Sequence, residues 1–253
     1  SQKTSLPVEL IIYDDASTDE TYKIVDSILD IESPNYIRLF QKENQMSKGQ
    51  KIAPIVLEKA KGKYIFLVDG DDYWAGSPLR LQEMVERMEI LKGLSFCFTD
   101  TIRFSENNSI TKSLLPDNLK RNYISQYDLR TFNYSFLNVG ACCFRNFGIK
   151  FPPEFQLQSH GDLLYPYLWG AYGPATYVPN AGTLMYRYNG LGQWSQKSAE
   201  ERAISKMIYA CQSTAIALKE GNIDAAISNS SRFLPLLVKH PRLKLLLKEY
   251  GIL

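Results

Sequence analysis

The sequence is short of the residues that most often build metal and redox centres. Four of its 253 residues are cysteine and two are histidine. No two cysteines form a CxxC pair, which argues against a zinc site. Cys97, Cys142 and Cys143 lie within apolar runs, so we expect buried, reduced thiols there. With only His160 and His240 present, catalysis built on a pair of histidines has few candidates.

The chain also has little net charge and no long apolar run. Its formal net charge is +2, which is too small to predict a nucleic-acid partner. No apolar run reaches the roughly 18–20 residues of a membrane span, and from the polar residues 1–5 we expect no signal peptide. Its 45% hydrophobic and 22% charged residues are typical of a folded globular protein. We therefore expect a cytoplasmic protein that binds no nucleic acid.

What the sequence contains is a regular alternation of apolar strands and amphipathic helices. Strands are expected at residues 8–13, 36–40 and 64–68, and helices at 22–29 and 52–60 between them. This order predicts an α/β fold, with a Rossmann-like, mainly parallel sheet flanked by helices. The first strand is apolar enough to be buried on both faces. Later helices are expected at residues 78–91, 161–169, 199–220, 223–233 and 235–250, later strands at 94–104, 136–144, 176–179 and 183–188, and a hairpin and loop at 105–122.

Two acidic clusters stand where predicted strands end. Asp14 and Asp15 follow the first strand, and Asp69, Asp71 and Asp72 follow the third. In open α/β sheets, ligands bind beyond the carboxyl ends of the strands. The placement of the two clusters therefore predicts a ligand site between them.

The second cluster has the composition of a divalent-metal site. Three carboxylates within four residues repel one another unless a cation or hydrogen-bond donors compensate them. Mg²⁺ and Mn²⁺ take carboxylate and phosphate oxygens as ligands, and such an ion stabilises the charge on a leaving nucleoside diphosphate. Gly70 lets the backbone turn sharply and come close to a ligand. The alternative is a solvated acidic turn that only precedes the next helix.

Four segments of the chain resemble family-2 glycosyltransferases of the GT-A fold. The similarity is specific over about residues 6–92, weaker in the following half, and absent over the C-terminal helices. It implies a domain over residues 1–195, with a nucleotide-sugar half (1–104) and an acceptor half (105–195), and a helical region at 196–253. The resembling segments, in chain order, are VELIIYDDASTDET (8–21), KENQ (42–45), AKGKYI (60–65) and LVDGDDYW (67–74).

The resemblance implies roles for the acidic residues. Asp14 matches the carboxylate that accepts a hydrogen bond from the nucleotide base, usually uracil, and Asp15 is placed with it among the donor-binding residues. Asp69 resembles the ribose- or metal-facing acid of a DxD motif, and Asp71 the metal ligand. Asp72 is similar to the family's trailing acid. Gly70, within the motif, is expected to lie against the nucleotide-sugar, and the implied cofactor is Mn²⁺ or Mg²⁺.

The resemblance also suggests a catalytic base and a closing loop in the second half. An inverting transferase needs a base that deprotonates the acceptor hydroxyl, and Asp162 resembles that carboxylate, with a simple N-cap as the alternative. His160 is either a partner of Asp162 or a surface histidine. Arg187 lies in a segment at 186–195 that is similar to the family's YRxH loop, and its guanidinium suits a phosphate. Trp194 is expected to cover the sugar or to be a core aromatic.

The chain departs from the family pattern in three places. Asn189 stands where a histidine is frequent, which weakens the case for a metal ligand there. Lys48 or Lys51 replaces an arginine that usually follows Asn44-Gln45. Family members begin with a strand and a helix that precede the part resembling Ser1-Gln2, so this chain is expected to lack them.

The sequence therefore predicts an inverting glycosyltransferase that uses a nucleoside-diphosphate-sugar, with UDP-sugar favoured. A saccharide or lipid-linked acceptor in surface polysaccharide or glycolipid synthesis is expected. Two alternatives remain: a Mg²⁺-dependent nucleotidyl- or phosphoryl-transferring enzyme, for which no Gly-rich phosphate loop is present, and an inactive, truncated nucleotide-binding module.

Residues 234–247 combine leucine and valine with lysine and arginine. They predict peripheral contact with an anionic membrane at its inner face. The alternative is a helix packed on the domain or on a partner, and Pro241 would interrupt a continuous apolar face.

Overall fold

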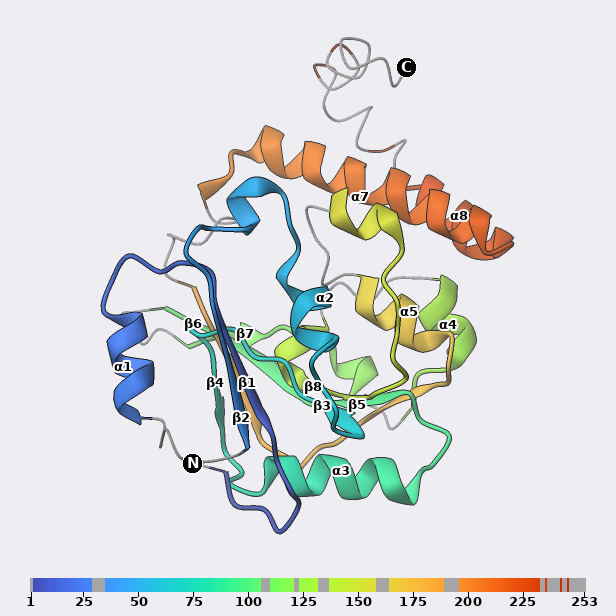
Figure 1. Cartoon of the computed structure of the whole chain (residues 1–253). Coiled ribbons are helices and arrows are strands. Elements are labelled where there is room, and N and C mark those ends of the chain that lie inside the picture. The colour runs from blue at the N-terminus through green and yellow to red at the C-terminus, as the bar shows by residue number, and fades with distance from the viewer. Residues whose placement is uncertain are drawn as a thin grey trace.

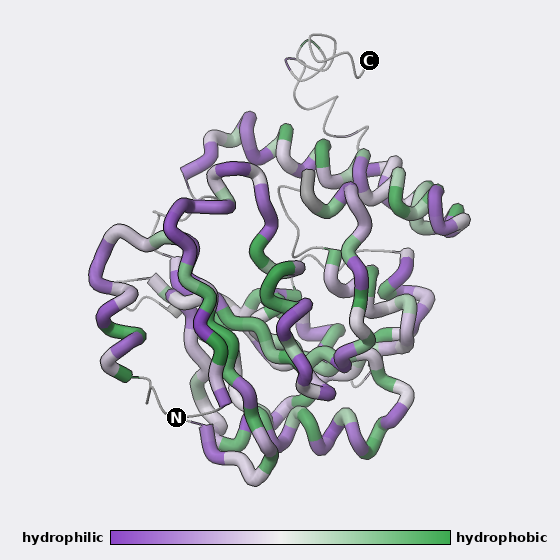
Figure 2. The backbone as a smooth tube through the Cα atoms, viewed as in Figure 1, coloured by the Kyte–Doolittle hydropathy of each residue, from purple (hydrophilic) through white to green (hydrophobic). Residues whose placement is uncertain are grey.

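The chain folds as an α/β protein, as predicted. The computed structural model describes residues 2–28, 35–105, 110–120, 123–131, 137–157, 164–188 and 196–232, together with Pro235, Arg242 and Leu245. Its strands lie at the centre and its helices around them (Figure 1). Apolar residues run along the central strands, whereas the outer helices alternate polar and apolar ones (Figure 2).

The first sheet has two parallel strands, β1 (Leu10–Asp14) and β2 (Tyr36–Phe40). Their register runs from Leu10 opposite Tyr36 to Asp14 opposite Phe40. Between them comes α1 (Thr21–Ile28), whose Tyr22 packs edge-on against Phe40 with 5.0 Å between ring centroids. Both strands therefore end on the same side, next to the first acidic cluster.

The second sheet, in the order β3-β8-β5-β9, forms the core. Along β5 and β8, successive side chains point to opposite faces of the sheet. Cys97 and Cys143 are partners in the ladder and face α3. Phe144 faces α5 and packs on Trp169, with 4.7 Å between ring centroids. The bounds are β3 (Tyr64–Ile65), β5 (Phe96–Phe98), β8 (Cys142–Arg145), β9 (Ala175–Tyr177), α3 (Arg80–Ile90) and α5 (Tyr165–Gly170).

The third sheet has the order β4-β10-β6-β7. Its inner strand β10 (Thr183–Arg187) runs parallel to β6 (Asp100–Phe104) and antiparallel to β4 (Tyr73–Ala75). The predicted hairpin is present, because β7 (Ile110–Ser113) pairs antiparallel with β6. Since β4 follows the second acidic cluster directly, this sheet fixes where that cluster lies.

Shorter helices connect these elements. They are α2 (Ile52–Leu57), α4 (Gln126–Thr131), and the 3-10 turns η1 (Met46–Lys48), η2 (Asp117–Leu119), η3 (Val139–Ala141) and η4 (Pro153–Leu157).

Two helices follow the sheets at the C-terminal side, α7 (Ala199–Lys219) and α8 (Ile223–Ser230), as predicted. Ser198 and Glu201 form a capping box that starts α7. The helix is tied to the domain where Glu220 accepts hydrogen bonds from Tyr167 Oη (2.7 Å) and from the guanidinium of Arg130. Most of the helix expected at 235–250 falls outside the described residues. Within the described ranges, no helix combines the length and the apolar character that crossing a membrane requires.

Three expectations need correction. The sheets are mixed, with antiparallel pairs where mainly parallel ones were predicted, because β4, β7 and β8 each run against a neighbour. The first strand is not buried on both faces: Val8 is 45% exposed and Leu10 is 46% exposed. This strand pairs only with β2 within the described structure, and a cavity lies beside it. The strand expected at 64–68 is hydrogen-bonded as a strand only over Tyr64–Ile65.

The expectation about the cysteines holds. Cys97, Cys142 and Cys143 are buried and free, and Cys211 is free and exposed. Burial raises the pKa of Cys143 well above the ordinary value for a thiol. The three buried thiols are thus inert packing groups.

Candidate active site

The turn after β1 holds the first acidic cluster in a tight conformation. Asp14 accepts a hydrogen bond from the backbone N–H of Ser17 at 3.3 Å, and a second, short one from its hydroxyl. Between them Ala16 has a φ of +64°, a left-handed conformation that alanine rarely adopts. The chain therefore turns back at once, and Asp14 stays at the carboxyl end of the strand.

The carboxylate of Asp15 fixes the loop that follows β2. Its two oxygens accept hydrogen bonds from the backbone N–H groups of Gln45 (2.7 Å) and Met46 (2.9 Å). The side-chain amide of Asn44 donates to the carbonyl oxygen of Asp15 at 3.1 Å. Asp15 was placed among the donor-binding residues, and its role there stays a prediction. What its contacts establish is that it joins the ends of β1 and β2.

Replacing Asp15 with alanine is expected to destabilise the protein. Two charge-assisted hydrogen bonds are lost at a half-buried site, so the free energy of unfolding should fall by about 1–3 kcal/mol. Urea unfolding followed by circular dichroism measures this change. Glu43→Ala is the matched control in the same loop, because that side chain is 69% exposed and pairs only at the surface with Lys48. Equal stability of the two variants would contradict a structural role for Asp15.

The second acidic cluster forms a closed turn. The backbone N–H of Asp72 donates to the carbonyl oxygen of Asp69 at 3.0 Å. Asp69, Gly70 and Asp71 are exposed, whereas Asp72 is half-buried. Burial raises the pKa of Asp72 to about 6. The neighbouring charges of Asp71 and Asp69 add to this rise, and the hydrogen bond from the backbone of Arg187 opposes it. The turn therefore concentrates negative charge that a cation would stabilise.

Arg187 joins the second cluster to the third sheet. Its backbone N–H donates to Asp72 at 2.9 Å, and its Nε donates to the carbonyl oxygen of Asp71 at 3.0 Å. The guanidinium also lies over the ring of Phe104, 5.4 Å from its centroid, and Tyr73 packs edge-on against the same ring at 5.3 Å. The registers of β10 with β4 and β6 bring these side chains together. The residue predicted to face phosphate thus lies on the acidic turn.

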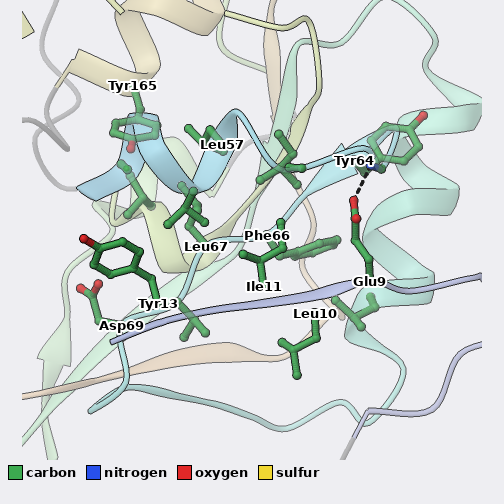
Figure 3. A pocket seen from close by; sticks show the side chains of 18 of the residues that line it. Glu9, Leu10, Ile11, Tyr13, Leu57, Tyr64, Phe66, Leu67, Asp69 and Tyr165 are labelled. Atoms are coloured by element: carbon green, nitrogen blue, oxygen red, sulfur yellow. Dashed lines mark hydrogen bonds between the residues drawn. The ribbon is translucent and has the colours of Figure 1, made fainter. Parts of the chain in front are cut away.

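A cavity of about 1090 Å³ reaches Tyr13, near the end of β1, and Asp69 and Gly70 of the second cluster. It lies between β1 and the extended run at residues 64–70, and it is lined mainly by apolar side chains. Figure 3 shows Tyr13 and Asp69 next to each other at one end and Glu9 at the other. Glu9 Oε1 accepts from the backbone N–H groups of Lys61 and Gly62, both at 2.6 Å. The ends of β1 and of the run at 64–70 thus open onto one space, whereas a ligand site between the two acidic clusters stays a prediction.

The lysine that the sequence left unassigned can now be placed. Lys51 lines this cavity, whereas Lys48 forms an ion pair with Glu43 in the loop. Lys51 is therefore the cation closer to the candidate site.

Four predicted residues cannot be placed. Asp162, the candidate base, and His160 beside it lie outside the described residues, and so do Trp194 and Asn189. Their roles stay predictions.

The candidate metal site consists of a single acidic turn. In the part of the chain that the structure describes, no group of three or more histidine, cysteine, aspartate or glutamate side chains has the arrangement of a metal cage. Mg²⁺ is commonly held by one or two carboxylates together with substrate phosphates. Asp69 and Asp71 fit a site of this kind, in which substrate phosphates supply further ligands.

Several contacts of the site were not foreseen from sequence. Trp74 Nε1 donates to the carbonyl oxygen of Gly140 at 2.8 Å, and the guanidinium of Arg80 lies 5.2 Å from the ring centroid of Trp74. These contacts hold β4, and hence the acidic turn, against the second half of the domain. Trp74, in the LVDGDDYW segment, could be expected to pack in the interior because it is large and apolar. The neighbouring sequence does not identify the residues that it contacts.

Comparison with known proteins identifies the family of the chain. The family model described as Glycosyl transferase family 2 matches residues 1–153. An uncharacterized protein of Mycobacterium tuberculosis is 35% identical over 98 residues, which are 39% of this chain and 28% of that protein. The Escherichia coli protein WfaP, a UDP-Glc:alpha-D-GlcNAc-diphosphoundecaprenol beta-1,3-glucosyltransferase, is 33% identical over 102 residues, 40% of this chain and 34% of WfaP.

An uncharacterized glycosyltransferase of Haemophilus influenzae is 33% identical over 96 residues, which are 37% of each chain. The chain spans about a third of the length of these curated relatives.

Proposed function

The chain belongs to glycosyltransferase family 2, and from this premise we propose that it transfers a sugar from a nucleoside-diphosphate-sugar to a saccharide or lipid-linked saccharide. The observation that carries the proposal is the acidic turn at residues 69–72, which Arg187 holds at one end of the cavity beside β1. The acidic turn suits a positive metal ion, and the arginine beside it suits the negative diphosphate that such an ion would bind.

The donor would lie across the ends of β1 and of the run at 64–70. Asp14 would accept a hydrogen bond from the base, with uracil favoured, and Asp15 would keep the neighbouring loop in place. Gly70 would allow the backbone to approach the nucleotide-sugar. Arg187 would bind the diphosphate through its guanidinium, and Trp194 would cover the sugar or the acceptor.

Asp69 and Asp71 would hold Mn²⁺ or Mg²⁺. When bound, the ion supplies positive charge that stabilises the leaving nucleoside diphosphate. Asp72 is half-buried and bonded to the backbone of Arg187, so its part would be to fix the turn. Asp162 would remove the proton from the acceptor hydroxyl, which would then attack with inversion at the sugar carbon.

The acceptor is proposed by chemistry. WfaP, by its name, acts on a diphosphoundecaprenol-linked sugar. A lipid-linked saccharide is therefore the acceptor class that we propose here, in the synthesis of a surface polysaccharide or glycolipid. Such an acceptor lies at a membrane, which suits the predicted peripheral contact of residues 234–247 and a cytoplasmic location. That stretch falls largely outside the described residues, so the contact stays a prediction.

The proposal predicts metal-dependent cleavage of a UDP-sugar. Release of UDP from a panel of UDP-sugars, measured with and without Mn²⁺, should show slow hydrolysis that disappears when the metal is chelated. Transfer to a lipid-linked saccharide should be faster than this hydrolysis. Cleavage between the phosphates would instead favour the nucleotidyl- or phosphoryl-transferring alternative. UDP binding without cleavage of any UDP-sugar would favour the inactive module.

A further inference from the structure

The outer face of α7 carries an apolar stripe at coiled-coil spacing. Successive members are separated by four, three, four and three residues, which is the spacing of a helix seam. Ile208 is 36% exposed and Leu218 is 56% exposed. Ile204 is half-buried, and Cys211 and Ala215 are exposed. The stripe consists of Ile204, Ile208, Cys211, Ala215 and Leu218.

This stripe is not the face that packs on the domain. The inner face of α7 is made of other side chains that are buried, including Ala203, Met207, Tyr209 and Ala217. The helix already has its intramolecular partner in α8, and it lies on the outside of the molecule (Figure 1). A second apolar seam on a helix that is already packed indicates a second partner.

Helix α8, which packs against α7, also has exposed apolar side chains. Ile223 is 56% exposed and Ile227 is 63% exposed, one helical turn apart. The stripe on α7 spans about 21 Å along the helix axis. A two-helix contact of that length covers less than the about 800 Å² per partner of a standard interface, so the residues on α8 would enlarge it.

We propose that this α7 stripe is an interface with a second copy of the chain, in which the two α7 helices pack antiparallel. The first turn of α7 is acidic, with Glu200 and Glu201, and its last turn is basic, with Lys219. Antiparallel packing sets each acidic first turn against the basic last turn of the other copy. It also opposes the two helix dipoles favourably. The nearly central position of Cys211 makes the stripe self-complementary, as a two-fold interface requires.

The charges favour a second copy over a membrane surface. Helices that lie on anionic membranes carry mainly lysine and arginine on the polar side of the apolar face. Here α7 carries charges of both signs along its length, with Glu200 and Glu201 in the first turn, Lys206 further on and Lys219 in the last turn. Lys219 is 66% exposed and pairs with Glu154 of η4. In the antiparallel arrangement it would therefore lie between Glu154 of its own chain and the acidic first turn of α7 in the other copy. Mixed charge of this kind is typical of the flanks of a coiled-coil seam.

The experiment is sedimentation velocity of the whole protein over the micromolar range. The wild type is expected to show a reversible monomer–dimer equilibrium. Ile208→Glu and Leu218→Glu should each weaken association about tenfold or more, with unchanged circular dichroism. Ile90→Glu is the matched control, because that side chain is 74% exposed on α3 and should leave the dimer intact. A wild type that stays monomeric throughout, or a Leu218→Glu variant that dimerises normally, overturns the proposal.

Cross-linking separates the second copy from other occupants. Cys211 is exposed and the other three cysteines are buried. A short bis-maleimide should therefore link two chains through Cys211, and Cys211→Ser should abolish the product. If residues 233–253 cover the stripe instead, Cys211 of a monomer would be protected from maleimide. If a membrane covers it, phosphatidylglycerol vesicles would bind a monomeric wild type but not Leu218→Glu. Either result contradicts the proposal.

Discussion

Replacing Asp71 with asparagine is expected to slow sugar transfer by about 100- to 1000-fold while leaving the fold intact. In the proposed mechanism this carboxylate holds the ion that stabilises the leaving diphosphate. Loss of such a ligand removes about 3–4 kcal/mol of transition-state stabilisation. The side chain is exposed and asparagine has nearly the same size, so the turn should survive. Steady-state transfer rates at saturating Mn²⁺, compared with the wild type, measure the effect.

Asp117→Asn is the control for this variant. That carboxylate is 93% exposed, and it forms an ion pair with Lys120 three residues away. Exposed pairs of this kind contribute little to stability, so both the rate and the fold should be unchanged. An Asp71→Asn variant that is as active as Asp117→Asn would remove the acidic turn from the mechanism.

Replacing Arg80 with alanine is expected to lower the free energy of unfolding by about 3–5 kcal/mol. Arg80 is fully buried. Its Nη1 donates to Thr99 Oγ1 (2.7 Å) and to the carbonyl oxygen of Ala181 (3.0 Å), and its Nη2 donates to that of Ala141 (2.9 Å). Burial lowers its pKa to about 10, so it remains charged at neutral pH. Alanine would leave three acceptors without this donor and a cavity beneath the ring of Trp74.

Denaturant unfolding with Arg80→Ala and Arg87→Ala measures this effect against a matched control. Arg87 lies on the same helix, two turns on, is only partly buried, and its Nε has no hydrogen-bond partner in the described structure. Replacing Arg87 with alanine should lower the free energy of unfolding by less than about 1 kcal/mol. Since Trp74 supports β4, Arg80→Ala should also reduce transfer. Equal stability of the two variants would show that Arg80 does not hold the sheets together.

The parts of the fold that local patterns govern were predictable. The strand at 36–40 and the helix at 199–219 follow from apolar periodicity. The acidic residues were found because carboxylates directly after an apolar strand are conspicuous in one dimension. The resemblance to family-2 glycosyltransferases then implied a role for each acidic residue, and it also implied one for Arg187.

Long-range contacts were not predictable. A charged residue in an amphipathic helix normally lies at the surface, and the partners of Arg80 are 19, 61 and 101 residues away in the sequence. The contact of Arg187 with the acidic turn spans 116 residues. The exposure of β1 was missed for the same reason. An apolar run predicts a strand, but only the arrangement of neighbouring sheets decides whether both of its faces are covered.

The most direct test of the central claim is Mn²⁺ binding followed by electron paramagnetic resonance, with and without UDP. The acidic turn supplies only part of a coordination shell, and the diphosphate supplies the rest. The account therefore predicts that UDP strengthens Mn²⁺ binding at a single site, and that Asp71→Asn abolishes this binding while Asp117→Asn does not. Equal Mn²⁺ affinity with and without UDP, or unchanged binding by Asp71→Asn, would contradict the claim that the turn at residues 69–72 holds the metal of a nucleotide-sugar site.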